Sequence, residues 1–112
     1  MRMNYRLFLS SFLPVLFLLG GSAVAFAAER SISQKGRTFS ETALALKKGD
    51  VVNFVNDDIM AHNIFSTSPG SEFNFGTQAP GASTPMTFNK SGEITVLCAI
   101  HPRMKMVVTV AD

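Results

Sequence analysis

Hydrophobic and polar residues alternate along most of the chain after residue 31. A period of two residues is typical of strands with one buried face, whereas an amphipathic helix repeats its apolar positions every three or four residues. Clusters of Gly, Asn, Asp and Ser interrupt the alternation within residues 47–50, 56–58 and 89–92, where such residues favour tight turns. The pattern predicts an all-β domain of about seven or eight short strands and no helix.

The predicted strands have one apolar face each. Ile94, Val96 and Cys98 share a face within residues 93–98, so the Cys98 thiol is expected at the end of a row that faces the core. The other predicted strands are a run that begins at residue 42 or 43 and residues 51–56, 61–66, 84–88 and 106–110. Two antiparallel sheets packed face to face are the simplest way to bury these strands, with residues 67–83 as a long surface loop.

A segment of different composition precedes the strands. Arg2 and Arg6 open it, residues 7–19 are almost entirely apolar, and Ala25 and Ala27 end it. This order of basic, apolar and small residues is typical of a secretory signal peptide. The apolar run is shorter than a membrane-spanning helix requires, although a retained anchor is the alternative. We therefore expect a signal peptide over residues 1–27 and a single periplasmic domain over residues 28–112, without stable membrane insertion after cleavage.

Removal of the leader would change the charge of the chain. Two of the ten basic residues lie in the leader, so eight basic residues would remain beside eight acidic ones. A neutral domain offers no electrostatic reason to bind nucleic acid or an anionic membrane, and we expect a monomer. Small exported domains often depend on disulfides, but this chain has a single cysteine, and a bound metal would protect that thiol.

Metal-binding side chains are concentrated in residues 98–106. Cys98, His101, Met104 and Met106 lie there, and the only other histidine is His62. Thiolate, imidazole and thioether together select copper and let it change oxidation state. Taken singly, a cysteine or histidine is more often a packing or hydrogen-bonding residue than a ligand. The only cysteine and both histidines, however, fall at the ends of strands and loops, which favours one metal site held by the scaffold.

Two methionines are alternatives for a fourth ligand. Met104 follows His101 by three residues and Met106 follows it by five, and either spacing could reach back to the metal. Met106 is in phase with Val108 and Val110 on the last predicted strand, so we expect it to pack in the core. This argument favours Met104.

The sequence also resembles a known family. Gly49-Asp50-Val51-Val52-Asn53-Phe54, then His62-Asn63, then Cys98-Ala-Ile-His101-Pro-Arg-Met104 are similar to the motifs of the plastocyanin and amicyanin group of cupredoxins. The resemblance implies a Greek-key β-sandwich that holds one type 1 copper ion, with His62, Cys98 and His101 as equatorial ligands. The short Cys-x-x-His-Pro-x-Met spacing resembles amicyanin and implies Met104 as axial ligand, whereas the longer spacing of plastocyanin and pseudoazurin would select Met106.

The residue after the cysteine departs from the family pattern, as does Val96-Leu97 before it, where the family commonly has an aromatic residue. Ala99 stands where these proteins commonly have Thr or Ser, whose hydroxyl meets the Asn after the first histidine. We therefore expect Asn63 to find a backbone group or water instead, which would change the hydrogen bonds around the thiolate.

Three functions are compatible with these residues. The leading hypothesis is a periplasmic electron carrier, not an enzyme, and the resemblance implies a cytochrome c or an amine dehydrogenase as its redox partner. The second is a copper-handling protein that delivers the ion, with Met60, Met86 and Met106 as additional thioethers. The third is a zinc hydrolase, for which Asp57 or Asp58 would have to serve as the general base.

Overall fold

The computed structural model describes residues 11–22 and 26–112. The predicted leader, residues 1–27, therefore lies partly outside the described residues, and its cleavage stays a prediction. Residues 11–22 contain no helix or strand. Within the described ranges, no helix is long and apolar enough to cross a membrane.

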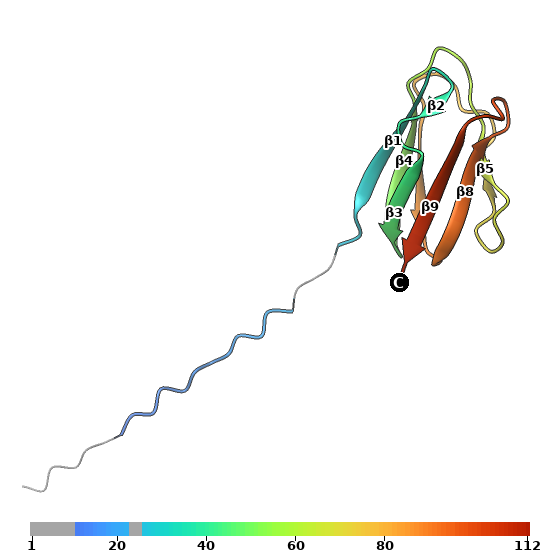
Figure 1. Cartoon of the computed structure of the whole chain (residues 1–112). Coiled ribbons are helices and arrows are strands. Elements are labelled where there is room, and N and C mark those ends of the chain that lie inside the picture. The colour runs from blue at the N-terminus through green and yellow to red at the C-terminus, as the bar shows by residue number, and fades with distance from the viewer. Residues whose placement is uncertain (1–10, 23–25) are drawn as a thin grey trace, which may run out of the picture.

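Nine strands are found in the described residues, and they form a two-layered sandwich (Figure 1). The strands are β1 (Glu29–Lys35), β2 (Thr38–Phe39), β3 (Ala43–Lys47), β4 (Asp50–Asn56), β5 (Ile64–Ser66), β6 (Phe73–Asn74), β7 (Ser83–Phe88), β8 (Gly92–Cys98) and β9 (Lys105–Ala111). One sheet has the order β2-β1-β4-β7 and the other β3-β9-β8-β5-β6. The predicted all-β sandwich is confirmed. The sequence predicted too few strands because β1 has a buried polar residue, Gln34, on the same face as Ile32. This glutamine interrupts the alternation of apolar and polar residues by which a strand is recognised.

The sheets are mixed, so the expectation of two antiparallel sheets was wrong. β1 runs parallel to β4, with Ile32 opposite Phe54, and β3 runs parallel to β9, with Leu46 opposite Val110. The remaining strand pairs are antiparallel. Alternation along a strand shows which face is buried, but it carries no information about the direction of the neighbouring strand.

The core lies between the two sheets and is built from the predicted inward faces. Val52 and Phe54 of β4 are fully buried, as are Val96 of β8 and Val108 of β9. Such burial contributes roughly 1.5–3 kcal/mol for each large apolar side chain. The packed core therefore gives a rigid support to the loops at both ends of the sandwich.

Three adjacent strands bring the predicted site residues to one end. β5 pairs with β8 so that Ile64 lies opposite Cys98, and β8 pairs with β9 so that Val96 lies opposite Met106. The start of β5, the end of β8 and the start of β9 therefore meet at the end of the sandwich opposite the C-terminus (Figure 1).

Candidate metal centre

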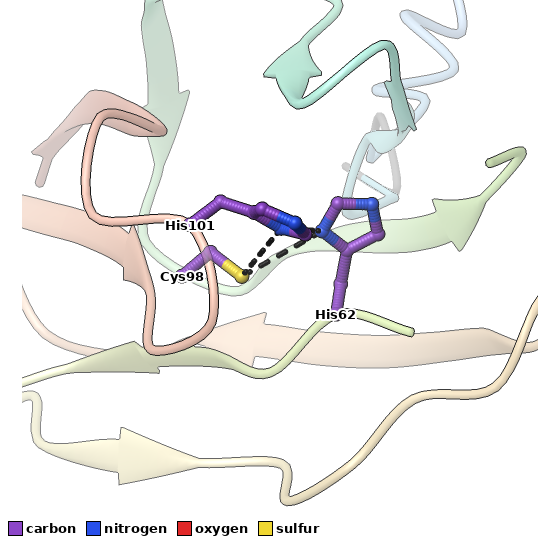
Figure 2. Close-up of side chains that lie close together, drawn as sticks. All are labelled: His62, Cys98 and His101. Atoms are coloured by element: carbon purple, nitrogen blue, oxygen red, sulfur yellow. Dashed lines mark hydrogen bonds between the residues drawn. The ribbon is translucent and has the colours of Figure 1, made fainter. Parts of the chain in front are cut away.

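Three predicted donor atoms converge on one point at this end (Figure 2). The Nδ1 atoms of His62 and His101 are 3.2 Å apart. The Cys98 Sγ atom lies 3.6 Å from Nδ1 of His62 and 3.9 Å from Nδ1 of His101. Residues separated by 36 and 39 positions are thus brought together by strand pairing.

His62 is held by the backbone just before β5. It was expected within a strand over residues 61–66, but β5 begins at Ile64, and His62 instead forms an isolated bridge with Gln78. The His62 N–H donates to the Gln78 carbonyl at 3.0 Å, and the Gln78 N–H donates to the His62 carbonyl at 2.7 Å. Gln78 lies in the segment that the sequence predicted to be a surface loop. This bridge therefore aims the buried imidazole inward without a continuous strand.

Cys98 is the last residue of β8, and its side chain faces inward as predicted, with 1% exposure. The backbone N–H of Asn63 donates to Cys98 Sγ at 3.4 Å, and the Ala99 N–H donates to the Asn63 carbonyl at 2.8 Å. The Asn63 side chain donates to Oδ1 of Asn74 at 2.8 Å. The expectation of a backbone or water partner for that side chain was wrong, because β6 places a second amide within reach.

His101 lies in the loop between β8 and β9 and is the most accessible of the three donors. Its carbonyl accepts a hydrogen bond from the Met104 N–H at 3.0 Å, which closes the loop into a turn. Its side chain is partly exposed, while those of His62 and Cys98 are buried. Burial, followed by the charges of His62 and Arg37, lowers the pKa of His101. The neutral imidazole that binds a metal is therefore favoured.

Asp58 contacts the ring nitrogen of His62 that does not face Cys98 and His101. Its Oδ2 atom lies 3.1 Å from Nε2 of His62, and the two side chains are 7% and 0% exposed. The carboxylate also accepts hydrogen bonds from the N–H groups of Arg37 and Ile59. Burial raises the pKa of Asp58. The hydrogen bond from His62 and those from the backbone together lower it by more, so the pKa of Asp58 is below its ordinary value. A carboxylate on the outer nitrogen of a ligand histidine fixes its tautomer and orientation.

The two methionines are both buried. Met106 lies on β9 opposite Val96 and is 0% exposed, so its predicted place in the core is confirmed. Met104 comes just before β9, is 1% exposed, and belongs to the same apolar cluster as Cys98. Met104 as the fourth ligand stays a prediction.

The donor set fits copper. Atoms bound to one ion at about 2.0–2.3 Å lie roughly 3–4 Å from one another, which matches the separations of 3.2, 3.6 and 3.9 Å. Two imidazoles and one thiolate in a trigonal set, with a weak thioether nearby, are typical of blue copper sites.

Comparison with known sequences identifies the family. Residues 27–111 match the family of copper binding proteins described as the plastocyanin/azurin family. The chain belongs to this family. Copper is accordingly its cofactor, as the donor set indicates.

The chain is also similar to individual copper proteins and their relatives. Methylamine utilization protein MauL from Methylorubrum extorquens is 32% identical over 72 residues, which are 63% of this chain and 63% of MauL. A purple cupredoxin from Nitrosopumilus maritimus is 26% identical with a TM-score of 0.65, over 73% of this chain and 99% of that one. A mutant amicyanin has the same fold, with a TM-score of 0.69 at 23% identity over 80% of this chain and 87% of that one. The cupredoxin fold implied by the sequence motifs is thus confirmed.

Proposed function

We propose that this chain is a periplasmic one-electron carrier in which His62, Cys98 and His101 hold a copper ion and Met104 is the axial ligand. The observation that carries the proposal is the convergence of the three donor atoms, two buried and one partly exposed, at one end of a rigid sandwich. Bound copper supplies a couple between Cu(II) and Cu(I).

The protein contributes a rigid donor set. His62 is held by its bridge to Gln78 and by Asp58, and Cys98 is held by β8 and the Asn63 N–H. These contacts form within the protein and do not depend on the charge of a bound ion. The donors therefore need to move little when an electron arrives or leaves, which favours fast transfer.

His101 provides the route to the surface. Its neighbours Ile100 and Pro102 are exposed, and the Ile100 side chain is 48% accessible. A small apolar contact around the imidazole edge suits a redox partner that must leave after transfer. The similarity to MauL and amicyanin supports a dehydrogenase or a cytochrome c as that partner. That the chain works as a monomer stays an expectation from its sequence.

The arrangement supports electron transfer over the two alternatives. Of the three thioethers invoked for delivery, Met106 is buried in the core and Met86 packs against it from β7, which leaves only the partly exposed Met60. Delivery of the ion along Met86 and Met106 would require the core to open. Hydrolysis would need a free general base, but Asp58 Oδ2 is bonded to Nε2 of His62 and Asp57 Oδ2 accepts a hydrogen bond from the Ser33 hydroxyl.

The test is an absorption spectrum and a redox titration of the copper-loaded protein. We expect an intense blue thiolate-to-copper band and a reversible one-electron transition, both of which Cys98→Ser abolishes. A copper-loaded protein without that band, or one that loses copper on reduction, would exclude the carrier function. Loss of the ion to a chelator within seconds would instead support copper delivery.

A further inference from the structure

Charge is distributed unevenly between the two ends of the sandwich, although the domain after residue 27 has equal numbers of acidic and basic residues. β1 and β4 run parallel and end at the metal centre, and β9 begins there opposite the end of β8. Four of the eight basic residues lie at this end: Lys35, Arg37, Arg103 and Lys105. The acidic residues there are Asp57 and Asp58, of which Asp58 is almost buried against His62.

The opposite end has the reverse balance. The turn between β3 and β4, the start of β8 and the end of β9 meet there. Its basic residues are Lys47, Lys48 and Lys90, and its acidic residues are Glu29, Asp50, Glu72, Glu93 and Asp112. The remaining two residues, Arg30 and Glu41, form an ion pair at 3.5 Å and so add no net charge to either end. The domain is therefore neutral in total but dipolar, with its positive end at the metal centre.

A hollow of about 490 Å³ lies beside His101 at the positive end. Ile100 and Pro102 give it an apolar wall, and the arginines Arg37 and Arg103 also line it. All four of these side chains are exposed. The metal ligand that is open to solvent is thus bordered by both apolar and cationic groups.

The backbone holds Arg37 beside the metal centre. Gly36 and Arg37 form the turn between β1 and β2 with φ angles of 60° and 61°, a conformation that is uncommon for a residue with a side chain. The Arg37 N–H donates at 3.3 Å to Asp58 Oδ2, the oxygen that also contacts His62. One buried carboxylate therefore positions both the ligand imidazole and the turn that carries this arginine.

We propose that this end of the molecule is a docking surface for a redox protein whose contact face carries acidic groups around an apolar centre. The inference rests on the proposed electron transfer. Ile100, Pro102 and the edge of His101 form the apolar contact, and Arg37 and Arg103 pair with carboxylates at its rim. Complementary charge mainly raises the rate of encounter, and the dipole turns the correct end toward an acidic partner. Equal totals of charge in the sequence concealed this surface.

The first test uses small oxidants of opposite charge on the reduced, copper-loaded protein. Ferricyanide is expected to react faster at low than at high ionic strength, and a cationic cobalt(III) complex slower. Arg37→Gln and Arg103→Gln should each slow the ferricyanide reaction roughly two- to tenfold at low ionic strength, because one charge is removed near a trivalent anion. The matched controls Lys47→Gln and Lys90→Gln, at the opposite end, should change the rate less than twofold. Equal effects of arginine and lysine variants would overturn the proposal.

The second test separates docking from electron transfer. Poly-L-glutamate is titrated into the isotope-labelled protein at low ionic strength, and amide NMR shifts are followed with poly-L-lysine as the comparison. Shifts around Ile100 and Arg103 with polyglutamate, lost in Arg37→Gln/Arg103→Gln, are expected even if the copper proves redox-inactive. Shifts only at the opposite end, or none with polyglutamate, would exclude the acidic partner.

Discussion

The Nε2 atom of His62 lies 3.1 Å from Oδ2 of Asp58, and both side chains are withdrawn from solvent. The two ring nitrogens of His62 thus have different partners. Nδ1 faces Cys98 and His101, and Nε2 contacts the Asp58 carboxylate. The negative charge behind the imidazole raises its basicity as a ligand. It also favours the more positive oxidation state of a bound ion.

Replacement of Asp58 by Asn should therefore weaken the site. We expect Asp58→Asn to lower copper(II) affinity roughly 10- to 100-fold and to raise the redox potential, because a negative charge near the ion is lost. Competition with a chelator measures the affinity, and a redox titration measures the potential. Asp57→Asn is the matched control, since Asp57 is exposed and bonds to Ser33 instead of His62. If both variants behave alike, Asp58 has no specific role at the metal.

The importance of Asp58 could not be predicted from the sequence. Asp57 and Asp58 are adjacent and equivalent in the chain, and only the folded turn decides that one contacts Ser33 and the other His62. The grouping of Cys98 with both histidines in one candidate metal site could be predicted because cysteine and histidine are so rare in this chain. The sandwich was predictable because alternation reports burial. The direction of the strands and the bridge between His62 and Gln78 could not be predicted, since both depend on contacts between distant segments.

The axial ligand can be identified by comparing two methionine variants. Met104→Leu should shift the redox potential while copper stays bound, because a weak thioether is lost and the three stronger donors remain. Met106→Leu should leave the potential unchanged and cost less than about 1.5 kcal/mol of stability, because the volumes of the two side chains are similar. Redox titration and thermal unfolding measure the two effects. A shift in potential with Met106→Leu alone would assign the axial position to Met106.

A buried pair of amides supports the backbone that carries His62. Gln34 Nε2 donates to Gln78 Oε1 at 2.7 Å, and Gln78 Nε2 donates to the Phe54 carbonyl at 2.8 Å. Gln34 Oε1 is the one buried side-chain oxygen or nitrogen of the described residues that lacks a hydrogen-bond partner. Gln34 therefore depends on Gln78 for its hydrogen bonding.

Gln78→Leu should lower the free energy of unfolding by roughly 1–3 kcal/mol, because it leaves the Gln34 amide buried and unpaired. The double variant Gln34→Leu/Gln78→Leu should lose less than the sum of the two single variants, since both amides are then gone. Urea unfolding of all four proteins measures the coupling. The copper spectrum should be retained throughout, because the backbone bridge between His62 and Gln78 needs no side chain. Strictly additive losses would show that the two amides act independently.

Asp50 holds the start of β1 in place at the end of the domain that lies opposite the metal centre. Its Oδ2 accepts the Lys47 N–H at 2.8 Å and its Oδ1 accepts the Ala28 N–H at 3.0 Å. These two hydrogen bonds hold the pKa of Asp50 below its ordinary value of 3.8, and the bond from Lys47 has the larger effect. Cleavage after Ala27, as predicted, would place an ammonium group at the same position and strengthen the contact with Ala28.

Stability should consequently depend on the ionisation of Asp50. A carboxyl whose pKa is lowered by folding stabilises the protein above its unfolded pKa and loses that contribution as the pH falls through its folded pKa. Asp50→Asn should therefore be less stable than the wild type at neutral pH, and the difference should shrink as the pH drops below 3.8. Urea unfolding across this range measures the difference, with Glu93→Gln as a control because Glu93 is exposed at the same end. A difference that stays constant down to the lowest pH at which the protein folds would show that the carboxylate charge is not what holds Ala28 and β1 in place.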